Sequence, residues 1–239
     1  MKKVFVALDV NTREKAIELA WHKLDPSLCG VKVGMELFTT AGIQIIHDLK
    51  KLKYDIFLDL KYHDIPNTVA GAVSAACDLG VSIVNVHTLG GKKMMEAAAN
   101  AVSKATHKPI LLGVTVLTSM DMGDLEDIGI IDIPSTASQV LKLASLAKIS
   151  GLDGVVCSGK EISLLREYLP KDFKLIVPGI RLPDGDVGDQ KRIVTPEKAF
   201  MDGADWIVVG RPITEAKDPL EALFHFNSRI AAVTIGNKM

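Results

Sequence analysis

Short runs of Val, Ile and Leu recur along the whole chain and are separated by longer stretches with helical spacing. Runs of this length are typical of strands buried on both faces of a sheet. Eight of them span residues 4–8, 31–33, 56–60, 83–86, 110–117, 155–157, 175–177 and 207–209. Between them, apolar residues such as Ala16, Leu19 and Ala20 return every three or four positions, as on the buried face of a helix. The pattern predicts eight strand–helix units.

The order of these units predicts how the strands pair. Strands that alternate with helices pair in parallel through right-handed crossovers, and eight such units in about 250 residues is the size of a (β/α)₈ barrel. We therefore expect a single (β/α)₈ (TIM) barrel domain over residues 1–239. An open, doubly wound sheet is the alternative, because the number of strands alone does not prove closure.

Two connections are longer than a barrel needs, at residues 118–134 and 181–195. In a barrel, every loop that follows a strand opens onto the face that holds the active site, and long loops without structure of their own are often lids or binding loops. Both connections are candidate lids, with ordinary surface insertions as the alternative.

Composition and charge narrow the class of partner. The 239 residues carry a formal net charge of −1 and no basic run, which disfavours nucleic acid and a membrane surface and favours a small-molecule ligand. The apolar run at 4–8 is too short for a signal peptide, and no run reaches the ~20 residues of a membrane span, so we expect a cytoplasmic protein. Cys29, Cys77 and Cys157 show no Cys-x-x-Cys spacing and are expected to be inert thiols.

The densest group of charged residues follows the third apolar run. Side chains alternate along a strand, so Asp59 and Lys61 are expected on the same side, with Asp64 in the turn just beyond. Two carboxylates would then flank one ammonium. Unit charges 4 Å apart attract by roughly 4 kcal/mol at an effective dielectric near 20, which favours the protonated form of Lys61. Such a lysine suits proton donation better than nucleophilic attack.

Other polar residues also stand at strand ends, which converge on one mouth in a barrel. Lys32 lies within an apolar strand and needs a carboxylate partner, for which Asp59 on the next strand is the candidate. Asp9 is open to two interpretations, a helix cap or a hydrogen-bond acceptor for a ribose. Thr118 is placed at the end of the fifth strand, and His87 is interpreted as a core or rim histidine. No histidine pair has metal-ligand spacing, so no metal site is predicted.

Two glycine–arginine segments follow the seventh and eighth strands: Pro178-Gly179-Ile180-Arg181 and Gly210-Arg211-Pro212. Glycine lets backbone N–H groups approach an anion, a following helix N-terminus adds its dipole, and arginine binds phosphate oxygens in a fork. Barrels commonly hold a phosphate at these two loops, so the segments predict a phosphate site.

Seven segments in this order resemble the family of orotidine 5′-phosphate decarboxylases of the bacterial type. They are Leu8-Asp9, Val31-Lys32-Val33-Gly34, Asp59-x-Lys61-x-x-Asp64-Ile65-Pro66, Thr115-Val116-Leu117-Thr118-Ser119, residues 151–158, Pro178-Gly179-Ile180-Arg181 and Val209-Gly210-Arg211. The resemblance runs from about Val4 to Pro219.

The resemblance implies a cofactor-free homodimer that converts orotidine 5′-monophosphate to uridine 5′-monophosphate and CO₂, the last step of de novo UMP synthesis. It makes Lys61 the proton donor to C6 and adds Lys32, Asp59 and Asp64 to a charged array, with Asp64 supplied by the partner subunit. The implied substrate contacts are Asp9 and Thr68 to the ribose, Thr118 to the pyrimidine, and Pro178, Arg181, Gln190, Gly210 and Arg211 on the phosphate side.

Three other functions compete with this hypothesis. A Mg²⁺-dependent 3-keto-L-gulonate 6-phosphate decarboxylase has a similar Asp-x-Lys-x-x-Asp motif, but the Lys32 cation fits poorly beside a divalent metal. A Schiff-base aldolase needs an uncharged lysine, which the carboxylates disfavour. A non-catalytic sugar-phosphate-binding barrel has no use for the four charged residues.

Overall fold

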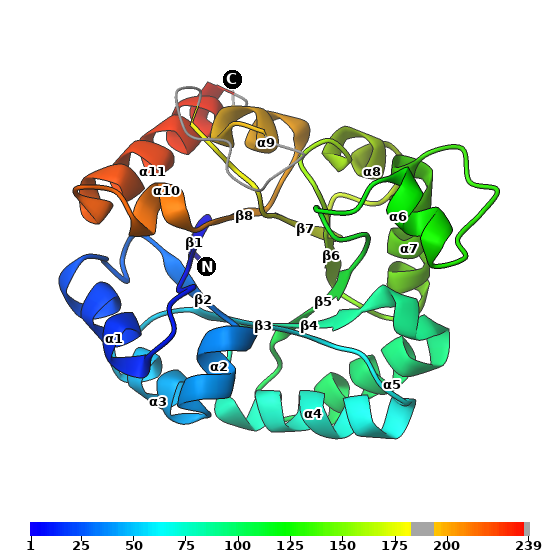
Figure 1. The fold of residues 1–239 in the computed structure, drawn as a ribbon, viewed down its shortest axis with the longest axis horizontal. Coiled ribbons are helices and arrows are strands. Elements are labelled where there is room, and N and C mark those ends of the chain that lie inside the picture. The colour runs from blue at the N-terminus through cyan, green and yellow to red at the C-terminus, as the bar shows by residue number, and fades with distance from the viewer. Residues whose placement is uncertain (183–193, 237–239) are drawn as a thin grey trace.

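Eight parallel strands form a closed barrel in which β1 pairs with β8, and helices surround it (Figure 1). The computed structural model describes residues 1–182 and 194–236. The strands are β1 (Val4–Ala7), β2 (Gly30–Gly34), β3 (Ile56–Tyr62), β4 (Ile83–His87), β5 (Ile110–Val114), β6 (Gly154–Val156), β7 (Lys174–Val177) and β8 (Trp206–Val209). Each strand overlaps one of the eight apolar runs. The predicted (β/α)₈ barrel is confirmed, and the open sheet is wrong.

The helices lie between consecutive strands, with a last long helix after β8. They are α1 (Arg13–His22), α2 (Met35–Ala41), α3 (Gln44–Lys51), α4 (Pro66–Leu79), η1 (Thr88–Gly90), α5 (Gly91–Lys104), α6 (Met122–Asp127), α7 (Thr136–Ile149), α8 (Ile162–Tyr168), α9 (Pro196–Asp202), α10 (Arg211–Thr214) and α11 (Pro219–Gly236). Helix α1 buries Ala16, Leu19 and Ala20, as its spacing predicts. Helix α4 begins at Pro66 and ends before Gly80, whose left-handed backbone terminates it.

The core has two layers because side chains alternate across each strand. One layer fills the space between the strands and the helices, and the other fills the inside of the barrel. The inner layer consists of Phe5, Ala7, Phe57, Ile83, Leu112, Ile176, Trp206 and Val208. The rings of Phe5 and Phe57 meet edge to face with their centroids 6.2 Å apart. A Cβ at Gly30 would lie 2.5 Å from the Phe5 ring, so glycine there leaves room for this packing. The inside of the barrel is thus packed, and Lys32 and Asp59 lie toward its mouth.

Two details of the predicted segmentation need correction, and a third cannot be compared. Strand β5 ends at Val114, so Thr118 lies four positions beyond the strand and not at its end. The connection at 118–134 is not an unstructured loop, because it contains α6, which Asp121 and Asp124 cap reciprocally. Most of the second long connection, residues 183–193, lies outside the described residues.

The three cysteines are buried, free thiols. Burial raises the pKa of Cys29 to about 12 and also raises the pKa of Cys157, which keeps both thiols protonated at neutral pH. This environment agrees with the prediction of inert cysteines. Within residues 1–182 and 194–236, no helix is long and apolar enough to cross a membrane.

Candidate active site

The site begins with an irregularity at the end of β3. Leu58 and Tyr62 pair with the two residues of β4 that flank Asn85, so residues 59–61 lie opposite this single asparagine. The extra length forms a bulge, in which Lys61 has a φ of 52°, in the left-handed region. A non-glycine residue in such a conformation costs about 1 kcal/mol or more, and strain of this kind gathers at functional sites. The regular alternation of side chains that predicted Asp59 and Lys61 on the same side therefore does not hold. Their side chains are nevertheless in contact.

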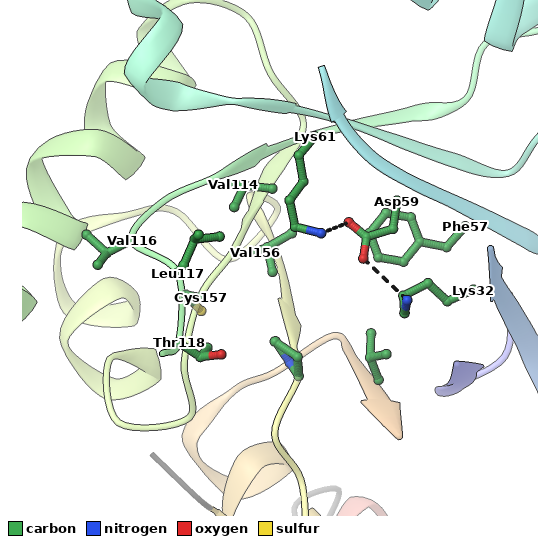
Figure 2. A pocket seen from close by; sticks show the side chains of 12 residues that line it. Lys32, Phe57, Asp59, Lys61, Val114, Val116, Leu117, Thr118, Val156 and Cys157 are labelled. Atoms are coloured by element: carbon green, nitrogen blue, oxygen red, sulfur yellow. Dashed lines mark hydrogen bonds and ion pairs between the residues drawn. The ribbon is translucent and has the colours of Figure 1, made fainter. Parts of the chain in front are cut away.

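A row of alternating charges crosses the mouth of the barrel (Figure 2). The ammonium of Lys61 donates to Oδ1 of Asp59 at 2.7 Å, and Nζ of Lys32 lies 3.5 Å from Oδ2 of the same carboxylate. Lys32 also donates to Asp9 at 3.0 Å. The predicted Lys32–Asp59 pair is confirmed. The predicted arrangement of two carboxylates around Lys61 is wrong within one chain, where Asp59 lies between two ammoniums instead.

The row holds Asp59 in its charged form. Burial alone would raise the pKa of Asp59, but the nearby Lys32 and Lys61 ammoniums and hydrogen bonds from Lys61 and Asn85 outweigh it and lower the pKa. The carboxylate is therefore ionised at neutral pH. Its two oxygens are both occupied, which fixes the orientation of both lysine side chains.

A largely apolar cavity of about 160 Å³ adjoins this row (Figure 2). Its charged side consists of Lys32, Asp59 and Lys61, and Thr118 lines it on another side. The remaining lining residues are Phe57, Val114, Val116, Leu117, Val156, Cys157, Pro178 and Val208. Such a cavity suits a flat ring with polar edges, and it places the Lys61 ammonium in a poorly hydrated space where its charge acts strongly.

A second cavity of about 320 Å³ adjoins the first and shares Lys32, Pro178 and Val208 with it. It is more polar and is lined by Ala7, Asp9, Gly179, Arg181, Gly210, Arg211, Thr214 and Glu215 as well. Both predicted glycine–arginine segments thus reach one cavity. Arg181 is buried and donates to the carbonyl of Ile180. The two arginines give this cavity groups that can bind an anion in a bidentate fork.

Several predicted residues lie elsewhere or have a different role. Asp64 is exposed and accepts from the backbone N–H of Ile65. Among the described residues of this one chain, it forms no ion pair with Lys61. Thr68 lies on the exposed first turn of α4, away from both cavities. Gln190 lies outside the described residues. The helix-cap interpretation of Asp9 is wrong, because Thr12 caps α1.

His87 is a rim histidine, as the sequence predicts. Its ring stacks on the ring of His63 with the centroids 5.5 Å apart, and its side chain accepts from the backbone N–H of Leu89. Burial, with His63 and Lys61 nearby, lowers the pKa of His87 to about 4. The ring is therefore neutral at neutral pH.

The sequence analysis missed Asn85. Its side chain is fully buried, accepts from the backbone N–H of Lys61 at 2.8 Å and donates to Oδ1 of Asp59 at 2.7 Å. One signal was available, because Asn85 is a polar residue inside the apolar strand Ile83–His87. The apolar lining of the first cavity carries no such signal, since those residues look like ordinary core in the sequence.

The barrel with a charged row at its mouth, next to an arginine-lined cavity, defines a (β/α)₈ enzyme for a small phosphorylated substrate. Residues 2–225 match the model of the orotidine 5′-phosphate decarboxylase / HUMPS family, and the chain belongs to this family. Orotidine 5′-phosphate decarboxylase of Teredinibacter turnerae is 53% identical over 220 residues, covering 92% of this chain and 94% of that protein. The enzyme of the same name from a Marinomonas species is 55% identical over 226 residues, covering 94% and 95%.

A solved structure agrees with these matches. The crystal structure of orotidine 5′-phosphate decarboxylase from Lactobacillus acidophilus has a TM-score of 0.85 and 41% identity, and the match covers 96% of this chain and 99% of that one. The family predicted from the seven sequence segments is confirmed.

Proposed function

We propose that this chain decarboxylates orotidine 5′-monophosphate to uridine 5′-monophosphate and CO₂, with Lys61 as the proton donor. The observation that carries the proposal is the Lys32–Asp59–Lys61 row, which borders an apolar cavity that continues into an arginine-lined one. The base would occupy the first cavity and the phosphate the second. The relatives' names support this activity over that of the gulonate-type enzyme.

The chemistry requires a cation at the carbon that loses CO₂. When the bond between C6 and the carboxylate breaks, its electron pair stays on C6, and the pyrimidine ring cannot readily delocalise it. A fixed ammonium stabilises this charge as it develops, in a cavity where the interaction is poorly screened. Lys61 then transfers a proton to C6 and regains one from water. Asp59 holds the ammonium in place at 2.7 Å.

The remaining residues would bind the substrate. Asp9 is assigned to the ribose and Thr118 to the pyrimidine. The assignment of Thr68 to the ribose rests on the family resemblance alone, because within its own chain Thr68 lies away from both cavities. Lys32 pairs with Asp9 and Asp59, so it links the ribose end to the reacting end. The phosphate side is assigned to Pro178, Arg181, Gln190, Gly210 and Arg211. Binding energy from the phosphate, remote from the reacting bond, would help to organise the site for the reaction.

The proposal is tested by incubating the purified protein with orotidine 5′-monophosphate and following the ultraviolet spectrum and the release of CO₂. We expect turnover that survives exhaustive chelation, because two ammoniums already occupy both oxygens of Asp59. Loss of activity with EDTA and recovery with Mg²⁺ on 3-keto-L-gulonate 6-phosphate would support the alternative enzyme. Binding of nucleotide without turnover would support a non-catalytic barrel.

We further propose a homodimer in which Asp64 completes the partner's site. Support comes from its position: it lies beyond β3, is exposed, and is followed by exposed Ile65 at the start of α4. A two-fold interface brings the same patch of both subunits together, so each dimer would contain two composite sites.

Mixing two inactive variants tests the shared site. Lys61→Ala chains combined with Asp64→Ala chains should form hybrid dimers with one intact site each. Random exchange makes about half of the dimers hybrid, so roughly a quarter of wild-type activity should return. If the subunits exchange, as shown by mass spectrometry, and no activity returns, Asp64 acts within its own chain.

Three broader predictions also belong to this proposal. Residues 1–239 would form one catalytic domain, and the enzyme would supply UMP for pyrimidine biosynthesis in the cytoplasm. Localisation of a tagged chain by fractionation, together with growth of a uracil-requiring decarboxylase mutant that carries this gene, would test both the compartment and the pathway.

A further inference from the structure

The side chain of Asn85 fills the gap that the bulge opens between β3 and β4. Three residues of β3 lie opposite this one residue of β4, so the regular backbone ladder is interrupted there. The backbone N–H of Lys61 finds its acceptor in the Asn85 side chain at 2.8 Å. The amide therefore replaces a hydrogen bond that a regular strand pair would provide.

The same amide also contacts the carboxylate beside Lys61. Its Nδ2 donates to Oδ1 of Asp59 at 2.7 Å, the oxygen that also receives the Lys61 ammonium at 2.7 Å. One side chain thus holds the backbone of the proposed donor and the carboxylate that orients the donor's ammonium. Asn85 is fully buried, and it does not line the cavity where the substrate ring would lie.

We propose that Asn85 is a positioning residue for decarboxylation, which holds Lys61 in its left-handed backbone conformation and aims its ammonium through Asp59. This inference rests on the proposed function. Its physical basis is the fixed geometry of an amide, which presents one acceptor and one donor side by side. Alanine offers neither group. Aspartate offers the acceptor but places a carboxylate against Asp59.

The first test replaces Asn85 by Ala. Without the amide, the Lys61 N–H loses its acceptor and the bulge can relax, which displaces the ammonium from the reacting carbon. We expect kcat to fall about 100-fold, a loss that a misplacement of about 1 Å can produce. KM for orotidine 5′-monophosphate should stay within about three-fold, because the phosphate contacts lie in the other cavity.

The second test, Asn85→Asp, gives a readout that a structural role alone would not produce. Lys32 and Lys61 keep Asp59 ionised, so a proton shared between the two carboxyls resides on the introduced one. The protonated carboxyl at position 85 can then donate a hydrogen bond to Asp59, as the amide does in the wild type. We therefore expect kcat to be low at neutral pH and to recover as the pH falls, in a range where the wild-type profile shows no such rise. A profile parallel to that of the wild type would overturn the proposal.

Thr88→Val is the matched control. Thr88 is fully buried just beyond the same strand, and its hydroxyl donates to the backbone carbonyl of Val114, a bond that involves none of the charged residues of the row. We expect it to lower the melting temperature without changing kcat. If it lowers kcat as much as Asn85→Ala does, or if neither Asn85 variant folds, the role of Asn85 is structural and the proposal is wrong. An inactive wild type would instead refute the proposed function.

Discussion

The two ends of the barrel carry charge clusters of similar composition. At the mouth, Asp59 lies between Lys32 and Lys61. At the opposite end, Asp205 lies just before β8 and pairs with Arg166 of α8 at 2.7 Å and with Lys174 of β7 at 3.3 Å. Each cluster has one carboxylate between two cations, and at the mouth Lys32 also pairs with Asp9, so the residue types alone do not reveal a difference in role.

The clusters differ in what else their polar atoms bind. Asp205 also accepts from the backbone N–H of Leu175, and Arg166 donates to the carbonyls of Gly203 and Phe173. That cluster therefore ties a helix, two strands and their connections together. Lys61, with three N–H donors, donates from its side chain to Asp59 and leaves donors toward the cavity. The comparison indicates that the cluster around Asp205 stabilises the fold and that the cluster with Lys61 is available to a ligand.

Breaking the cluster around Asp205 should give the largest effect on stability. Asp205→Ala removes the carboxylate that pairs with Arg166 and Lys174 and accepts from the Leu175 N–H, so we expect the free energy of unfolding to fall by about 3 kcal/mol. Urea titration monitored by circular dichroism measures it. Asp172→Ala, on an exposed neighbour, is the control and should have little effect. A loss equal to the control's would mean that the cluster does not hold the fold.

Arg211→Ala should weaken catalysis without comparable damage to the fold. Loss of a charge-assisted contact to phosphate costs about 2 kcal/mol in kcat/KM for orotidine 5′-monophosphate. The slow reaction of the phosphate-free nucleoside should not change. Lys217→Ala, an exposed cation beyond α10 and outside the cavity, is the control. Equal losses with both substrates would remove Arg211 from the phosphate site.

The smallest effect concerns His87 at the rim of the mouth. Its pKa is about 4 in the folded chain against 6.5 ordinarily, so between these values the unfolded chain binds a proton that the folded chain does not. Stability from this group is therefore lost as the pH falls from 6.5 to 4. Because water partly screens the half-buried ring, His87→Gln should reduce this loss by only about 1 kcal/mol. If the free energy of unfolding depends on pH in the same way in the wild type and in His87→Gln, this prediction is wrong.

The sequence predicts the barrel because each strand is a separate apolar run, and it predicts the mouth because Lys32, Asp59 and Arg211 stand at or near strand ends. The same reasoning does not predict the bulge at the end of β3. A period of two places Asp59 and Lys61 on the same side, whereas the contact here depends on a left-handed Lys61 and on Asn85 from the next strand. Tertiary pairing creates this geometry, and no local pattern encodes it.

The helix in the connection at 118–134 does have a signal in the sequence. Asp121 followed by Asp124 is a capping signature, and it would have placed α6 within the connection at 118–134. The proposed partner of Asp64 cannot be deduced in this way, because a contact across a dimer would leave no trace in the pattern of one strand.

The central claim is that the charged cluster at the mouth serves catalysis and the cluster at the opposite end serves the fold. A lysine-to-alanine substitution in each cluster tests this claim most directly. Lys61→Ala and Lys174→Ala each remove an ammonium from an aspartate, 2.7 Å away in one case and 3.3 Å in the other. We expect Lys61→Ala to lower kcat by at least about 10⁴-fold, with nucleotide binding and the unfolding free energy nearly unchanged. Lys174→Ala should keep kcat within about two-fold while it lowers stability by up to about 1 kcal/mol. Near-normal turnover of Lys61→Ala, or similar losses of kcat in both variants, would contradict the division of roles between the two clusters.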